Sequence, residues 1–466
     1  MKVNQQDTIT ALATAAGVGA IAVIRLSGKN CFTILNTVFR TKKEKVKDFA
    51  SLPSHTIHFG YLVDDDKTID EVLCAVFKNP HSYTGDDTVE INCHGSSFIQ
   101  QQILELLINN GARLAEPGEF TLRAFLNGKL DLAQAEAVAD LIASTSASSH
   151  RLALQQMRGG FSTQIKILRT QLIDFASLIE LELDFSEEDV AFADRTKLTE
   201  LVQQLLSVIK KLRESFAAGN AMKNGIPVVI AGKPNVGKST LLNALLNDEK
   251  AIVSHIAGTT RDVIEDEIVL KGIRFRFIDT AGIRPAKDEI EKIGIERTHE
   301  QLKLASIIIY MLDANQTSPA DLQMELSALK SQLTNTNVML IPVINKIDTL
   351  KNDLQLTAYK NLENIIFIAA KKQLHLDQLT NKLLSFIQSE QTSNSDTIVS
   401  NSRHATSLSN AEAALQKVVD GIKDNLTTDL LAFEIRDALQ HLGAITGEIY
   451  TDDLLANIFS KFCIGK

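Results

Sequence analysis

The residues best suited to chemistry form one stretch, Gly232-Lys233-Pro234-Asn235-Val236-Gly237-Lys238-Ser239. It follows the apolar run 226–231 and precedes a helical pattern that begins at Thr240. A glycine-rich turn between a strand and a helix points its backbone N–H groups at a bound phosphate. In such a loop Lys238 reaches the β- and γ-phosphates and the Ser239 hydroxyl binds Mg²⁺. A glycine turn before an ordinary helix is the alternative, but it would not require this full eight-residue spacing.

A second strand end adds to this phosphate site. The strand predicted over 274–278 ends at Asp279-Thr280-Ala281-Gly282. Asp279 can hold Mg²⁺ through water, and Gly282 can donate its N–H to the γ-phosphate. A strand that ends in a turn aspartate is common, so this motif gains its meaning from the phosphate loop beside it.

Two later stretches indicate the base. An apolar strand ends at Asn345-Lys346-Ile347-Asp348, and a carboxylate at Asp348 can accept two N–H donors from guanine, which adenine does not offer. Ala369-Ala370-Lys371 follows another apolar run, and its backbone is expected to meet the guanine O6. The sequence therefore predicts GTP rather than ATP.

The segment between the phosphate loop and Asp279 is expected to close on the nucleotide. We assign to Thr260 the role of binding Mg²⁺ when the γ-phosphate is present. The GTP contacts predicted from this segment come from Ser254, His255, Ile256, Ala257, Gly258, Thr259 and Thr260.

The position after Gly282 departs from the Ras-like pattern. Ras-like proteins carry there a Gln that orients the attacking water, whereas this chain has Ile283, which cannot do so. Another polar group must act, and Asp288, Glu289 and Glu291 follow. A monovalent cation could neutralise the transition-state charge. Asn235 could ligate that cation with carbonyls from 254–259, or it could merely shape the turn.

Composition narrows the class of protein. The chain has 466 residues, a net charge of −9, and four cysteines without CxxC spacing, which argues against a disulfide framework or a zinc knuckle. Apolar runs are too short to span a bilayer and the start lacks a signal pattern, so we expect a cytoplasmic protein. The acidic balance would not attract nucleic acid, so any RNA contact needs a local patch or a partner.

The elements that must position these residues fall into four predicted segments. Residues 1–120 are expected to be mixed α/β, 121–220 helical, 221–385 a doubly wound α/β GTPase domain, and 386–466 helical after a polar linker over 389–410. The predicted fold is multidomain: an N-terminal α/β domain and a central helical domain into which a Ras-like P-loop GTPase domain is inserted.

Over essentially its whole length the chain resembles the tRNA-modification GTPase family MnmE, also called TrmE. Beside the GTPase motifs, the resemblance rests on Val23-Ile24-Arg25-Leu26-Ser27-Gly28, the stretches 116–120 and 124–132, and the terminal Phe462-Cys463-Ile464-Gly465-Lys466. It implies a homodimer formed through N-terminal domains that resemble the folate-binding fold of one-carbon transferases. It also implies a pocket for 5-formyl- or 5,10-methylene-tetrahydrofolate, with Cys463 near the one-carbon unit and a lining of Arg25, Glu90, Lys129 and Lys466.

The resemblance also implies a mechanism. In the family K⁺ replaces an arginine finger, which matches Asn235, Ser254, Ile256 and Thr259 as ligands, and the counterpart of the glutamate that organises the attacking water is Glu291. The usual Ser-Ala-Lys or Ser-Ala-Arg guanine loop is Ala369-Ala370-Lys371 here, a change expected to matter little because recognition there is by backbone. The implied partner is the flavoprotein MnmG, with which the enzyme would install a carboxymethylaminomethyl or aminomethyl group on C5 of the wobble uridine of tRNA.

Two other functions compete with this one. A ribosome-assembly or RNA-binding regulatory GTPase would be expected to carry a basic domain such as a KH element with its Gly-x-x-Gly loop, and none follows the GTPase motifs. A folate-dependent transferase with a vestigial switch would show no K⁺-stimulated turnover.

Overall fold

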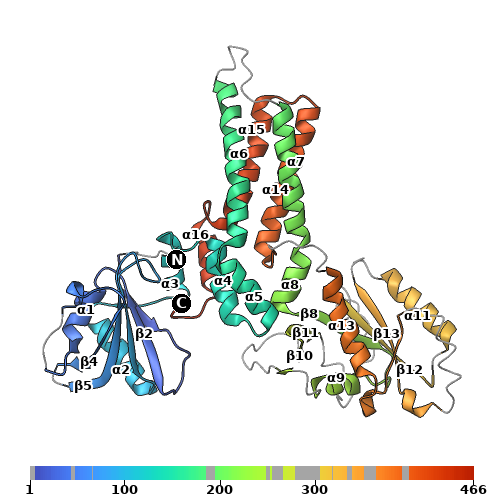
Figure 1. Ribbon diagram of the computed structural model, residues 1–466, viewed down its shortest axis with the longest axis horizontal. Coiled ribbons are helices and arrows are strands. Elements are labelled where there is room, and N and C mark those ends of the chain that lie inside the picture. Colours follow the sequence, from blue (N-terminus) through green and yellow to red (C-terminus); the bar gives the residue numbers. More distant parts are fainter. Residues whose placement is uncertain are drawn as a thin grey trace. The chain divides into compact units, whose positions relative to one another are not determined.

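A computed structural model describes residues 6–43, 48–65, 67–184, 195–247, 252–253, 266–278, 305–316, 318–332, 338–350, 364–390 and 398–466. The chain divides into two compact units (Figure 1). Unit 1 comprises Met1–Ala139, Gln156–Arg195 and Asp420–Lys466, and unit 2 comprises Asp140–Gln155 and Thr196–Val419.

Unit 1 contains a seven-stranded sheet with the order β3-β4-β5-β6-β2-β1-β7. Neighbouring strands are antiparallel except for the parallel pair β1 and β7. The strands are β1 (Ile9–Leu12), β2 (Ile21–Ser27), β3 (Phe39–Arg40), β4 (Thr56–Asp64), β5 (Lys67–Phe77), β6 (Thr88–His94) and β7 (Arg113–Leu114). These strands agree with the mixed α/β character expected for residues 1–120.

One face of this sheet is covered, and the other is open over β4 and β5 among the described residues. Ile24, Val72 and Ile91 point to the same face and pack in a core with α1 (Cys31–Val38) and α2 (Ser97–Asn109). The alternate positions Ile57, Phe59 and Leu73 are 66%, 50% and 45% exposed. Antiparallel sheets commonly keep one face on the core and one toward solvent, but that second face is then usually polar. The apolar open face therefore calls for an explanation.

Helices make up the rest of unit 1. The long helix α6 (Gly160–Asp184) packs along α15 (Thr428–Thr446), and α16 (Asp452–Phe459) packs on α3 (Glu119–Leu126). Phe459 and Phe462 share a core with Leu122 and Phe125 of α3, which fastens the last residues of the chain to the start of the helical region. The unit also contains the 3₁₀ turn η1 (Phe49–Ser51) and most of α4 (Leu132–Ala143).

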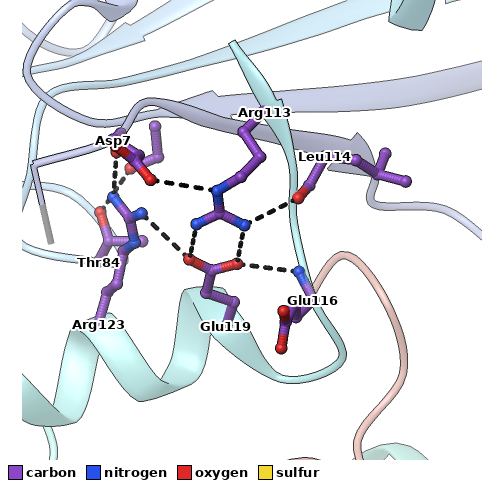
Figure 2. A network of polar contacts seen from close by, with 8 residues as sticks. Asp7, Thr84, Arg113, Leu114, Glu116, Glu119 and Arg123 are labelled. Carbon is purple, nitrogen blue, oxygen red and sulfur yellow. Dashed lines mark hydrogen bonds and ion pairs between the residues drawn. The ribbon is translucent and has the colours of Figure 1, made fainter. Parts of the chain in front are cut away.

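A buried carboxylate fixes the start of α3 against the sheet (Figure 2). The Glu119 side chain, 1% exposed, accepts hydrogen bonds from Arg113 at 2.7 and 3.1 Å and from Arg123 at 3.1 Å. Arg113 also bonds Asp7 at 3.3 Å, and Arg123 donates to the Asp7 carbonyl at 2.7 Å. Burial by itself would raise the pKa of Glu119, but these bonds and charges, together with the Glu116 N–H, hold the pKa below its usual range.

Unit 2 contains a second seven-stranded sheet, with the order β14-β13-β12-β8-β11-β10-β9. The strands from β14 to β11 are parallel, and β10 and β9 continue the sheet antiparallel. They are β8 (Ile226–Gly232), β9 (Ile252–Val253), β10 (Asp266–Leu270), β11 (Ile273–Phe277), β12 (Ile307–Asp313), β13 (Met339–Asn345) and β14 (Ile366–Phe367).

Helices cover both faces of this sheet, as the alternating pattern predicted. Helices α9 (Lys238–Leu246) and α13 (Leu376–Glu390) share one core with β8, β12 and β13. On the other face Leu322 and Leu329 of α11 (Pro319–Gln332) pack with the opposite side of the same strands. The remaining helical elements of the unit, three of which cross its boundary, are α5 (Ala147–Met157), α7 (Arg195–Glu214), α8 (Phe216–Asn224), η4 (Ile347–Thr349), η5 (Ala370–Lys372) and α14 (Ser402–Lys423). The order of strands and the two helical layers are those of a doubly wound α/β domain.

The structure contradicts part of the predicted linker over 389–410. Helix α14 begins at Ser402, nine residues before the expected helix start at Ala411. His404, Leu408 and Ala411 recur at helical spacing and are buried. The many Ser and Asn residues around them hid this sparse stripe, because composition reports loop character whereas burial depends on the few residues of one face.

Two further predictions concern disulfides and membrane-spanning helices. None of the four cysteines, all of which are described, forms a disulfide. No described helix is long and apolar enough to cross a bilayer.

Candidate nucleotide site and N-terminal pocket

The phosphate loop lies where the sequence placed it, between β8 and α9. Gly232 and Gly237 have φ values of +143° and +100°, a region that favours glycine. At both positions a Cβ atom would collide, with the Met311 carbonyl at Gly232 and with the Asn345 amide at Gly237. Gly237 is the N-cap of α9, so Lys238, Ser239 and Thr240 form the first turn of that helix. The N–H groups of a helix's first turn have no partner within the helix, which makes them available to a bound anion.

The Lys238 ammonium group lies over this loop. Its Nζ donates to the carbonyls of Gly232 at 2.7 Å and Lys233 at 3.0 Å. Burial lowers the pKa of Lys238. A half-buried ammonium that is held, among the described residues, by neutral carbonyls is well matched to a phosphate anion, which would replace those carbonyls by charged acceptors.

Asn345 joins three of the predicted motifs. Its side chain is buried, donates to the Val236 carbonyl in the phosphate loop at 2.8 Å, and accepts from the Ala370 N–H at 3.0 Å. One amide thus holds the phosphate loop and the segment Ala369-Ala370-Lys371 at fixed positions on the end of β13. The sequence predicted these motifs separately, and the structure brings them together.

Lys346 makes a second connection. Its backbone is left-handed (φ +66°), and its Nζ donates to the Asn235 carbonyl at 2.8 Å and to the Asp313 carboxylate at 2.7 Å. Sequence analysis missed Asp313, although its position offered a signal: it ends an apolar strand, as Asn345 does, and the two residues pair in register. Burial by itself would raise the pKa of Asp313, but bonds from Lys346 and Asn315 hold that pKa below its usual range.

Asp348 lies in η4, two residues after Lys346. Its carboxylate is 3.4 Å from the Lys372 ammonium, and its side chain is 14% exposed, so an edge of it remains accessible. Ala369 and Ala370 are buried while Lys371 is exposed. Neither alanine has a polar side-chain group, so the polar atoms of this pair are those of the backbone.

The other predicted nucleotide contacts lie outside the described residues. They are Ser254, His255, Ile256, Ala257, Gly258, Thr259, Thr260, Asp279, Thr280, Ala281, Gly282 and Glu291. Within the described part of the chain, no group of three or more His, Cys, Asp or Glu side chains could hold a metal ion. The described Mg²⁺ candidate is Ser239, whose hydroxyl oxygen in the first turn of α9 is a donor that a hard cation accepts.

A second cluster, in unit 1, surrounds Arg25 on β2. The guanidinium donates twice to one oxygen of Glu90, at 2.7 and 3.1 Å, and lies 5.0 Å from the Tyr83 ring centre and 5.5 Å from that of Phe120. The Arg25 side chain is 10% exposed. Sequence reasoning missed Tyr83 altogether, and it quoted Phe120 in a matching stretch without giving it a role.

The last residues of the chain complete this cluster. The Gly465 carbonyl is 3.5 Å from Arg25 Nη1, and Lys466 Nζ lies 5.7 Å from the Tyr83 ring centre. Burial and the nearby Arg25 charge lower the pKa of Lys466, against the opposing effect of Glu90. Two cations and one carboxylate therefore share an aromatic-lined site that combines segments 440 residues apart.

The remaining two predicted pocket residues lie less centrally. Lys129 donates to the Pro80 carbonyl at 3.0 Å, an exposed bond that does not involve the Arg25 cluster. Cys463 is exposed, and its carbonyl accepts from the Gly118 N–H at 3.4 Å. The structure thus brings together Arg25, Glu90 and Lys466, with Cys463 three residues before Lys466.

Comparison with known proteins covers the whole chain. Residues 8–129 match the family model described as GTP-binding protein TrmE N-terminus, and residues 132–463 match the MnmE helical domain. The tRNA modification GTPase MnmE of Flavobacterium johnsoniae is 54% identical over 99% of both chains. That of Cytophaga hutchinsonii is 55% identical over 99% of this chain and 98% of the relative.

Solved structures match mainly one part of the chain. The G domain of the T. maritima FeoB iron transporter is 25% identical, with a TM-score of 0.24 over 34% of this chain and 98% of its own. A GTP-binding protein from Sulfolobus solfataricus in complex with GDP is 18% identical, with a TM-score of 0.27 over 48% of this chain and 67% of its own. These scores are too low to support an argument, so the doubly wound fold rests on the strand order above.

Proposed function

The chain belongs to the MnmE family of tRNA modification GTPases, and from this premise we propose how its residues carry out that activity. It hydrolyses GTP to GDP and phosphate, and its relatives favour tRNA modification over the alternative of a ribosome-assembly GTPase. The observation that best supports our residue assignment is the Asn345 amide, which bonds the phosphate loop at 2.8 Å and the predicted guanine segment at 3.0 Å.

In the proposed GTP site, Asp348 accepts the two N–H donors of guanine and the backbone of Ala369-Ala370-Lys371 meets its O6. Lys238 exchanges its loop carbonyls for the β- and γ-phosphates. Ser239 and Thr260 hold Mg²⁺, with Asp279 acting through water. When bound, Mg²⁺ neutralises charge on the phosphate oxygens.

K⁺ takes the place of an arginine finger in this proposal. Ile283 cannot orient water. Asn235 has a left-handed backbone (φ +63°), and its carbonyl accepts a hydrogen bond from Lys346, which fixes the backbone from which its side chain extends. Its proposed co-ligands are Ser254, Ile256 and Thr259, and the proposed organiser of the attacking water is Glu291. The bound K⁺ would supply the positive charge, and Glu291 would position the water that Ile283 cannot orient in place of the Ras-like glutamine.

The test is GTP turnover in K⁺ against Na⁺ buffer, for the wild type and Glu291→Ala. We expect turnover at least about tenfold faster in K⁺, which corresponds to about 1.4 kcal/mol of transition-state stabilisation. Severe loss is expected in the variant in both salts. Equal wild-type rates in the two salts would exclude the cation, and an active variant would exclude Glu291.

The Arg25 cluster is the proposed tetrahydrofolate pocket. A folate carries a carboxylate tail, which a cation of the pocket can pair with, and a pterin whose N–H groups can donate to Glu90. Arg25 and Glu90 lie 2.7 Å apart and would therefore contact the same end of the ligand. Tyr83 and Phe120 offer ring surface beside these charges. Lys129 is proposed to line the outer part of the pocket and Cys463 to lie near the one-carbon unit of a 5-formyl- or 5,10-methylene-tetrahydrofolate.

The charge arrangement supports a ligand of this kind. Three ionised groups beside two aromatic rings are costly to bury unless each is paired. Arg25 is paired with Glu90, whereas no side-chain carboxylate among the described residues forms an ion pair with Lys466, whose pKa is lowered by burial and by the Arg25 charge. An anionic ligand would supply that partner. Binding of 5-formyltetrahydrofolate, measured by calorimetry, tests the proposal: Arg25→Met should abolish binding, and unchanged affinity would refute it.

We further propose a cytoplasmic homodimer that works with the flavoprotein MnmG on C5 of the wobble uridine, the folate supplying the methylene carbon of the aminomethyl or carboxymethylaminomethyl group. The four predicted segments, 1–120, 121–220, 221–385 and 386–466, would serve as folate and dimerisation domain, first helical part, GTPase domain and second helical part.

The open sheet face supports the dimer. Phe59 and Leu73 are cross-strand neighbours on it, and an apolar patch of this kind usually marks a protein contact. Ala75 and Glu90 pair in register on the same face, so the patch extends toward the proposed pocket.

A further inference from the structure

Asp313 has no assigned role in the site, yet it lies at the centre of it. The residue ends β12 and pairs in register with Asn345 at the end of β13. Its side chain, 5% exposed, accepts hydrogen bonds from Lys346 Nζ at 2.7 Å, the Asn315 N–H at 2.9 Å and Asn315 Nδ2 at 3.1 Å. A carboxylate bonded in this way is firmly oriented, and one of its oxygens is committed to Lys346.

Lys346 carries that orientation into the phosphate loop. Its ammonium bridges the Asp313 carboxylate and the Asn235 carbonyl, which belong to different elements of the sheet edge. Both Lys346 and Asn235 have left-handed backbones, with φ values of +66° and +63°. Such conformations persist in residues other than glycine when surrounding contacts enforce them, and this bridge is such a contact.

The charge of Asp313 is needed for the bridge. A lysine ammonium is strongly hydrated and has three donors, so a single neutral carbonyl would not hold it away from water. Lys346 is 36% exposed and could turn outward once the anion was removed. Without the Asp313 charge, the Asn235 carbonyl would lose its hydrogen bond from Lys346. The segment Asn345-Lys346-Ile347-Asp348 would then lose this link to the phosphate loop.

We infer that Asp313 is a positioning residue that, through Lys346, holds the segment Asn345-Lys346-Ile347-Asp348 against the phosphate loop at Asn235. Asp313 touches neither base nor phosphate in this role, and it affects nucleotide binding by holding the two halves of the site in register. The inference rests on the proposed GTP site and extends it to a residue outside the recognised motifs.

The test is a double-mutant cycle on GDP affinity, measured with the full chain by displacement of a fluorescent GDP analogue. Asp313→Asn keeps the shape and removes the charge, and we expect it to weaken GDP binding about tenfold or more, as loss of a charge-assisted bond does. In a Lys346→Gln background the same change should have little further effect, because the bridge is already absent. The control is Glu267→Gln, the same carboxylate-to-amide change in a residue of β10 that pairs with Arg274 of β11 at 3.3 Å. It should leave GDP affinity within about twofold of the wild-type value.

The outcomes separate this inference from the proposed function. Unchanged GDP affinity in Asp313→Asn, or effects of Asp313→Asn and Lys346→Gln that simply add, would overturn the positioning role. A residue that served stability alone would lower the melting temperature of the nucleotide-free protein without this non-additive loss of affinity. Asp348→Asn, in the same assay, reports on the guanine site itself, so normal GDP binding in that variant would overturn the site rather than the positioning role of Asp313.

Discussion

Replacing Asn345 by aspartate tests the side-chain amide that connects the phosphate loop to the segment Ala369-Ala370-Lys371 in the GTP site. The change keeps the size of the side chain and the acceptor for the Ala370 N–H, but it replaces the Nδ2 donor by an oxygen that lies 2.8 Å from the Val236 carbonyl. With the carboxylate ionised, two acceptors face each other at a buried position. Leaving a buried carbonyl unsatisfied costs about 1–3 kcal/mol, and the desolvated charge adds to this.

The pH dependence of the Asn345→Asp variant has a definite sign. The introduced carboxyl group, when protonated, could donate its O–H to the Val236 carbonyl, so the folded state favours the neutral acid and its pKa rises above the unfolded value of about 3.9. A group whose pKa is raised by folding binds a proton that the unfolded chain has lost. The stability of the variant relative to wild type should therefore fall as the pH rises from about 4 through the folded pKa, and remain constant above it.

The assay compares GDP affinity and thermal midpoints between pH 5 and pH 8. At pH 8 we expect GDP binding weakened about tenfold or more, equivalent to about 1.4 kcal/mol, with partial recovery at pH 5. Asn364→Asp is the matched control: its exposed oxygen accepts from Lys382 at 3.1 Å, which a carboxylate can also do, so the effect should stay within about 0.5 kcal/mol. Wild-type affinity in Asn345→Asp, or a loss independent of pH, would refute the proposed role of this amide.

Four further results are expected. Asp348→Asn should weaken GDP binding and improve xanthosine diphosphate binding, because xanthine presents a carbonyl where guanine presents an amino group, and an amide can donate to that carbonyl. Competition between the two nucleotides measures this preference, and a retained preference for guanine would contradict the prediction. Arg25→Lys should lower 5-formyltetrahydrofolate affinity about tenfold or more in calorimetry, since an ammonium cannot pair with Glu90 through two N–H groups and also present a flat face to Tyr83, whereas full affinity would show that charge alone suffices. Phe59→Asp on the open sheet face should shift the protein from dimer to monomer in sedimentation, and an unchanged dimer would place the interface elsewhere. Glu119→Gln should lower the melting temperature at neutral pH, with the difference narrowing as the pH falls below about 4.3, because the carboxylate of depressed pKa stabilises the fold only while ionised; a constant difference would argue against the ion pairs.

The sequence by itself determined the local parts of this protein. Phosphate binding needs glycines, a lysine and a hydroxyl at fixed spacing within one strand–turn–helix, so residues 232–239 could be recognised without any distant contact. Alternating and helical patterns likewise indicated which segments are mixed α/β and which are helical, since each pattern reflects one buried face. The pattern failed at 402–410, where the buried stripe was too sparse to stand out from polar neighbours.

Tertiary structure decided which of these parts meet. Arg25 and Gly465 are 440 residues apart, and no periodicity indicates that the last residues of the chain pack beside Tyr83. Asp313 looked like an ordinary strand end until the parallel pairing of β12 and β13 placed it opposite Asn345 and within 2.7 Å of Lys346. Spacing along the chain encodes chemistry that one segment completes alone, whereas sites shared among segments depend on strand order and register, which emerge only when the whole core is packed.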